Sequence, residues 1–159
     1  MYAAATRVLV HERDVKRQHL EGSTMNECPK MEATITRLAE AHGFNIKAPR
    51  GFMQLTIDQE GVRDLSVEKI GKNIVSVSQY YKVNGMLVPE PDITFFMGPT
   101  GWVPTAIGQS VEGWKYCATP DAEILRVSDS QLCAEIAGMA EEWADMLDER
   151  YRSNARRVR

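Results

Sequence analysis

The carboxylates beside a proline-rich segment are the side chains of this chain with the best placement for chemistry. Glu90 and Asp92 flank Pro91, and Asp58 and Glu60 stand near the expected end of a strand. Two acids on a loop beside a sheet can hold a divalent cation or act as acid and base. The pattern is also common by chance, and an Asp after Pro often caps a turn. We expect no catalytic residue, and keep a metal-assisted hydrolase or nuclease using Glu90, Asp92 and Asp58 as an alternative.

The other reactive groups form no recognisable set. His11, His19 and His42 have no spaced Cys or carboxylate beside them, whereas a zinc site needs about four convergent ligands. The run from Gly98 to Gly101 is too short for a phosphate loop, and no Lys-Ser or Lys-Thr follows it. We therefore expect neither a metal nor a cofactor.

Cysteine usage bears on the compartment. Cys28, Cys117 and Cys133 are an odd number without metal-type spacing, which predicts free thiols in a reducing compartment, by default the cytoplasm. Cys117 falls in an expected strand and Cys133 on an apolar helix face, where thiols are usually inert packing. No apolar window approaches the roughly 18 residues of a membrane span. The short apolar run 2–10 also lacks the preceding basic region of a secretory signal.

The stretch from Gln79 to Pro104 combines aromatic residues with Asn, Gly and Pro, which suggests a rigid recognition surface on a β-scaffold. Tyr80 and Tyr81 must point to opposite faces of a strand, so only one of them can be a contact residue. Tryptophan near a hairpin end is equally compatible with an interaction hot spot and with a core position. The expected binding residues are Tyr81, Asn84, Asp92, Trp102 and Trp114.

These side chains need a scaffold, and the chain divides into four parts. Residues 1–50 predict an N-terminal helical segment, in which Pro29 suits a first turn and Gly43 the end of a helix. Residues 51–127 predict an antiparallel sheet of about five to seven strands. Residues 128–152 predict an amphipathic helix that opens on the capping box Ser-Asp-Ser-Gln, and residues 153–159 a basic tail that frays.

Turn signals refine the sheet. Asn84-Gly85 predicts a tight turn, because both residue types tolerate positive φ. Pro89 and Pro91 forbid a central strand, so residues 86–92 should be a loop or a sheet edge. Strands joined by hairpin-length connections leave no room for helical crossovers. The fold class expected is α+β, with helices from both ends of a single domain packed on the antiparallel sheet.

Charge gives weak guidance on partners. A formal net charge of −3 argues against a dedicated polyanion binder. The last helix carries six acids that could imitate nucleic-acid phosphates, although an ordinary solvated face looks the same: Glu135, Glu141, Glu142, Asp145, Asp148 and Glu149. The tail could instead contact phosphates through counterion release, using Arg150, Arg152, Arg156, Arg157 and Arg159.

Three segments together resemble an uncharacterised bacterial domain family: GFMQL from Gly51, NIVSVSQYYKVNGMLVPEPDITF from Asn73, and GWVPTAIGQSVEGWKY from Gly101. The resemblance implies an accessory gene of a phage, plasmid or other mobile element, without an established activity. Lys82, Met86 and Glu90 depart from the family pattern, the first two where an acid is usual. Loss of carboxylates from this loop shifts the expectation from catalysis to binding.

The function we expect is therefore that of a non-enzymatic binding protein, an accessory or inhibitory factor of a mobile element that contacts a host or defence protein. The surface expected for it is the loop face of Tyr81, Asn84 and Trp102. Two alternatives stay open: the metal-assisted hydrolase or nuclease, and nucleic-acid binding through the arginine tail.

Overall fold

The computed structural model describes residues 26–49, 52–121 and 123–155. The first half of the expected N-terminal helical segment, residues 1–25, lies outside these ranges, as do His11 and His19. Two helices, α2 (Pro29–Ala41) and α3 (Ser130–Ala155), accompany the strands β1 (Met53–Gln59), β2 (Val62–Gly71), β3 (Ile74–Val83), β4 (Met86–Met97), β5 (Trp102–Gln109), β6 (Gly113–Tyr116), β7 (Ala118–Asp121) and β8 (Ile124–Val127).

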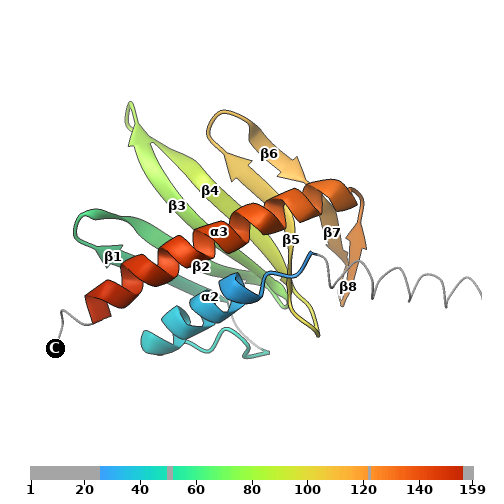
Figure 1. Cartoon of the computed structure of the whole chain (residues 1–159), viewed down its shortest axis with the longest axis horizontal. Helices are drawn as coiled ribbons and strands as arrows, with labels where there is room; N and C mark the ends of the chain where they lie inside the picture. Colours follow the sequence, from blue (N-terminus) through green and yellow to red (C-terminus); the bar gives the residue numbers. More distant parts are fainter. Residues whose placement is uncertain (1–25, 50–51, 122, 156–159) are drawn as a thin grey trace, which may run out of the picture.

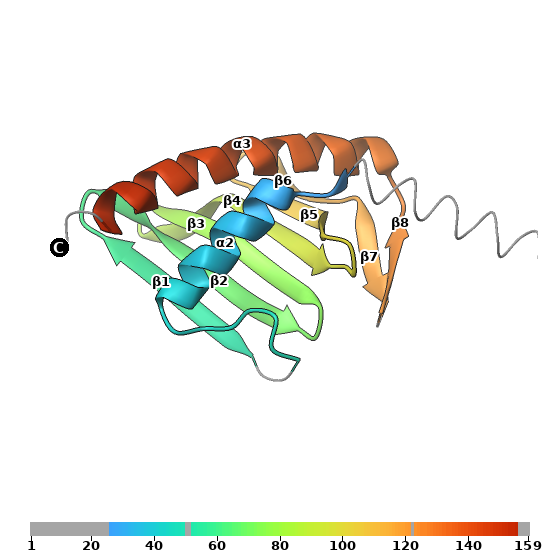
Figure 2. The ribbon, with the colours of Figure 1, turned by 60° about the horizontal axis from the view of Figure 1, so that its bottom comes forward.

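The first six strands form one antiparallel sheet in the order of the chain, and β7 pairs with β8 in a separate hairpin. Both helices lie across the same face of the six-stranded sheet, with α3 running diagonally over the strands (Figures 1 and 2). The α+β class and the antiparallel sheet are thereby confirmed.

Alternation along the strands determines which face is covered. In β1, Met53, Leu55 and Ile57 are buried while the residues between them are exposed. Their row continues across the sheet, where the register sets Val67 beside Val77 and Val77 beside Ile93. These side chains form one core with the apolar side of the helices, including Ile35, Leu38, Ile136 and Leu147. Neither of the two described helices lies on the opposite face of the sheet (Figure 2).

β4 is longer than the sequence indicated, because residues 86–92 belong to the strand. Pro89 pairs with Tyr80 of β3, and the Glu90–Pro91 peptide bond is cis. β4 pairs with β5 only from Asp92 onward. The two prolines therefore stand where β4 has a partner on one side, which agrees with the expected sheet edge and not with a loop.

The two helices are held together by three of the acids of α3, a role that the sequence did not indicate. The N-terminus of α2 has no side-chain cap of its own. Instead, the backbone N–H groups of Lys30 and Met31 in α2 each donate a hydrogen bond to a carboxylate oxygen of Glu141 in α3, at 3.1 Å. Asp145 also pairs with the Lys30 ammonium and Asp148 with Arg37. The carboxylate of Glu141 thus caps α2 from the other helix, and its negative charge is stabilised by the positive N-terminal end of the α2 dipole.

The capping box expected at the start of α3 does not form, because the cap is Asp129 and the residue three positions on is Leu132. Asp129, not Ser128, accepts the backbone N–H of Leu132, at 3.0 Å. Ser128 instead donates its hydroxyl to the carbonyl of Cys117, at 3.1 Å. At its other end α3 continues to Ala155, beyond the expected residue 152.

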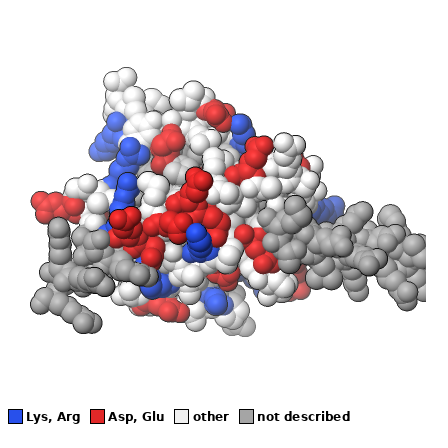
Figure 3. Space-filling model, in the orientation of Figure 1, with Lys and Arg blue, Asp and Glu red and all other residues white. Residues whose placement is uncertain are grey.

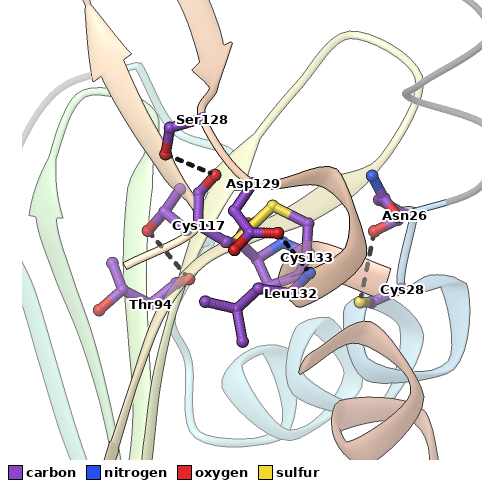
Figure 4. The surroundings of a disulfide bond; sticks show 10 residues. Asn26, Cys28, Thr94, Cys117, Ser128, Asp129, Leu132 and Cys133 are labelled. Carbon is purple, nitrogen blue, oxygen red and sulfur yellow. Dashed lines mark hydrogen bonds between the residues drawn. A yellow bond between two sulfur atoms is a disulfide. The ribbon is translucent and has the colours of Figure 1, made fainter. Parts of the chain in front are cut away.

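The prediction of three free thiols is wrong for two of them. Cys117, between β6 and β7, forms a disulfide with Cys133 in the first turn of α3, and their Cα atoms are 5.3 Å apart (Figure 4). Cys28 is free and fully buried, and burial, aided by Glu141, raises the pKa of its thiol to about 12. The expected cytoplasmic location loses the argument on which it rested. Among the described residues, neither helix has the length and apolar character to cross a membrane.

Candidate binding surface

The face of the sheet that points away from α2 and α3 places two of the expected binding residues, Asp92 and Trp114, in one row. Register sets Ser78 beside Asp92, Asp92 beside Gly108, and Gly108 beside Trp114. The neighbouring row, which contains Ile93 and Ile107, faces the helices, so this row faces the other way. A carboxylate on β4 and an indole on β6 thus lie on the same face, with β5 between them.

Asp92 is the polar centre of this face. Its side chain is only 7% exposed. One carboxylate oxygen accepts a hydrogen bond from Ser76 Oγ and the other from the Tyr80 hydroxyl, each at 2.7 Å. Burial, followed by the hydrogen bond to Asp92, raises the pKa of Tyr80 to about 12. These two hydrogen bonds join β3 to β4 through their side chains. Asp92 is therefore not the turn cap that one interpretation of the sequence suggested.

The titration of Tyr80 tests this network. Its folded pKa lies above the ordinary value of 10.0, so its contribution stabilises the fold below pH 10 and is lost as the pH rises toward 12. The tyrosinate absorbance of wild type minus Tyr80→Phe should show a midpoint near pH 12, and Asp92→Asn should move that midpoint down. A wild-type midpoint near pH 10 would contradict the contact.

Trp114 lies on the edge strand β6 and is 46% exposed. Its ring lies directly over Gly108, where a Cβ atom would come within 2.8 Å of the indole. It also stacks with Tyr116, which is exposed, at 6.3 Å between ring centroids. Gly108 is therefore required for the close approach of this aromatic pair to the sheet.

The β3–β4 hairpin carries two more of the expected residues. Asn84 and Gly85 have φ values of 52° and 80°, which confirms the Asn-Gly turn, and Asn84 is exposed. Tyr81 is half-buried, and the Arg63 guanidinium stands 4.9 Å from its ring centroid. Around the turn, the large apolar side chains of Val83, Met86 and Leu87 face solvent.

Trp102 does not belong to a surface. It is 2% exposed and packs against Phe95, with 5.6 Å between ring centroids. Its carbonyl accepts the backbone N–H of Cys28, at 2.8 Å, which ties the segment before α2 to β5. Tyr81, Asn84 and Trp102 therefore do not form the single loop face that the sequence led us to expect. The sequence was equally compatible with an interaction hot spot and with a core position for Trp102, and the structure supports the core position.

The three acids of the hydrolase alternative do not converge. Glu90 accepts the hydroxyl of Ser110 at 2.6 Å, which links β4 to the β5–β6 turn, while Asp92 is occupied by Ser76 and Tyr80. Asp58 is exposed on the edge strand β1. Within the described part of the chain, no three or more His, Cys, Asp or Glu side chains are grouped so that they could hold a metal ion. Among the described residues, Asp58, Glu90 and Asp92 therefore form no common metal site.

Acidic side chains gather over the helices, as Figure 3 shows in the orientation of Figure 1. Three of the six acids of α3 contact α2, as described above, so they act at least partly in joining the helices. For the arginine alternative, Arg150 is exposed at the end of α3, whereas the Arg152 side chain and Arg156, Arg157 and Arg159 lie outside the described residues.

Sequence reasoning missed Tyr80, Tyr116, Met86 and Leu87. The sequence did indicate that Tyr80 and Tyr81 point to opposite faces of the strand, so Tyr80 could have been considered as well as Tyr81. The sequence could not show that Tyr80 would reach Asp92, because that needs the register of β3 against β4, including its irregularity between Ser78 and Tyr80.

A model of a protein family described as a domain of unknown function (DUF6908) matches residues 33–150, well over half of the chain. The match confirms the resemblance to an uncharacterised family. It covers α3 almost to its end and most of α2, beyond the segments on which the resemblance was based. Neither the curated proteins nor the solved structures contain a significant match to the chain.

Proposed function

Because the chain belongs to this family of unknown function, no activity follows from its membership, and we propose from the geometry that it is a non-enzymatic binding protein that contacts another protein. One observation carries the proposal. Six of the thirteen exposed large hydrophobic side chains of the described residues lie on two neighbouring hairpins, β3–β4 and β5–β6: Val83, Met86, Leu87, Val111, Trp114 and Tyr116. We call these six the hairpin surface.

Exposure of this kind favours association. Met86 is 71% exposed, and burying a large apolar side chain against a partner releases roughly 1.5–3 kcal/mol. Aromatic residues and Met are enriched in interface cores, and the pair of Trp114 and Tyr116 offers a flat anchor. Both hairpins project beyond α3, where the helices do not cover them (Figure 1).

The hairpin surface is also held in place before any partner binds. The hydrogen bond from Ser110 to Glu90 joins the β5–β6 turn to β4, and the hydrogen bond from Tyr80 to Asp92 joins β3 to β4. A preorganised surface loses less conformational freedom on binding, which favours affinity.

In its finer form, the proposal is that the chain is an accessory or inhibitory factor of a mobile genetic element, and that its partner is a host or defence protein. The support for this is the sequence resemblance, together with the exposed apolar side chains of the hairpin surface.

The test is a quantitative pull-down with purified tagged protein, comparing wild type with a double variant, Met86→Asp and Trp114→Ala. The double variant should lose the partners that wild type recovers. In a titration, a recovered partner should then bind wild type at least tenfold more tightly than it binds the double variant. Both positions are exposed, so the fold should persist, as circular dichroism would verify.

Ile124→Asp serves as the matched control, because Ile124 is equally exposed but lies on β8, in the separate hairpin. It should retain every partner of wild type. If the hairpin variant keeps the same partners as wild type while Ile124→Asp loses them, the proposed surface is the wrong one.

A further inference from the structure

A hollow of about 320 Å³ lies at the end of the strands opposite the hairpin surface. Its walls come from three connections: the segment after α2, the β2–β3 turn and the β4–β5 turn. Apolar lining includes Met97 and Trp102, while the charged lining consists of Lys47, Lys69, Lys72 and Glu32. A cavity of this size accommodates a small ligand.

Lys69 is the unusual member of this set. It lies on the helix-covered face of β2, between Met53 and Val75 in the register, and is only 4% exposed. Its ammonium donates to the backbone carbonyl of Ala48. Within the described residues no carboxylate pairs with it. A buried ammonium is costly unless it is paired, and one carbonyl satisfies one of its three donors.

The charges around the hollow favour an anion with more than one negative charge. Three ammonium groups line it against the single carboxylate of Glu32, a difference of two positive charges. Lys72 also pairs with Glu123 at 3.1 Å, but both side chains are largely exposed, so that this pair is weak and exchangeable. Lys47 is exposed and can turn toward a ligand.

We propose that this hollow binds the phosphate group of a small phosphate monoester. Lys69 contacts the phosphate from the buried side, Lys47 and Lys72 close over it from the rim, and the organic part lies against Met97. A phosphate monoester carries a charge of about −1.5 to −2 at neutral pH, which matches the excess positive charge of the lining. Lysine is a common phosphate ligand as a point charge.

Calorimetric titration of the full chain with phenyl phosphate and with inorganic phosphate tests the proposal. Wild type should bind phenyl phosphate with a Kd of about 1 mM or tighter. Lys69→Met should weaken binding at least tenfold, while Glu32→Gln, which removes the opposing charge, should strengthen it about threefold. Lys30→Met is the control, because Lys30 pairs with Asp145 outside the hollow and its loss should leave the affinity unchanged.

Lys69→Met keeps the apolar stem and removes the buried charge, so the protein should still fold. If it does not, the rim variant Lys47→Met with Lys72→Met gives the same test, again with a loss of at least tenfold. Absence of saturable binding by wild type, or binding by Lys69→Met equal to wild type, would overturn the proposal. Equal affinity for phenylacetate would overturn the assignment of phosphate.

The hairpin variant Met86→Asp with Trp114→Ala should bind phenyl phosphate as wild type does, because the two sites lie at opposite ends of the strands. Loss of the partner protein and loss of the phosphate are therefore separate results, and either proposal can fail without the other.

Discussion

Replacing Trp102 with alanine is expected to lower the free energy of unfolding by about 3–5 kcal/mol, because the substitution leaves a large cavity in a packed core. Its indole is buried between the sheet and the helical layer, beside Phe95. A domain of this size has a total stability of about 5–15 kcal/mol, so the variant should lose a large part of it. Urea unfolding followed by circular dichroism measures the change.

Trp114→Ala is the matched control, since it removes the same side chain from a position that is 46% exposed. Its stability should fall by about 1 kcal/mol or less, while binding through the hairpin surface is lost. A pull-down with Trp102→Ala alone would mislead, because an unstable protein also loses its partners. Similar stability losses in the two variants would contradict the assignment of Trp102 to the core.

The contrast between the two tryptophans shows what a sequence can determine. Each follows a glycine and stands near a hairpin end, so local sequence treats them alike. Their difference comes from the sheet: Trp102 starts β5, between β4 and β6, and meets the segment before α2, whereas Trp114 lies on the edge strand β6. Strand order is a long-range property that residue types and spacing do not determine.

Features that depend on near neighbours were predictable. The alternation of Met53, Leu55 and Ile57 follows from one wet face of a strand, and the Asn84-Gly85 turn follows from tolerance of positive φ. The cap of α2 was not predictable, because Glu141 is more than a hundred residues away and reaches Lys30 and Met31 only after the helices pack. The same holds for the approach of Lys69 to Ala48.

The disulfide is the clearest case of long-range geometry overriding composition. An odd cysteine count and the absence of a metal pattern favoured free thiols, and nothing in the spacing of Cys117 and Cys133 indicated a pair. Packing of α3 near the start of β5 brings both sulfur atoms close to the carbonyl of Pro104, at 3.2 and 3.6 Å. Cys28 remains the odd cysteine.

Reduction of this disulfide is expected to lower the free energy of unfolding by about 3 kcal/mol, because the bond closes a loop with a sequence separation of 16 and so restricts the unfolded chain. That change should lower the Tm by about 6–12 °C for a domain of this size. Thermal unfolding of wild type with and without a phosphine reductant measures it.

The double variant Cys117→Ala with Cys133→Ala separates the bond from other effects of the reductant. Its Tm should lie near that of reduced wild type and should not respond to reductant, because only Cys28 remains and its buried thiol is protonated at neutral pH. Thiol titration of denatured, oxidised wild type should find one free thiol. Three free thiols under those conditions would show that the bond does not form, and the attachment of α3 to the connection between β6 and β7 would then rest on non-covalent contacts.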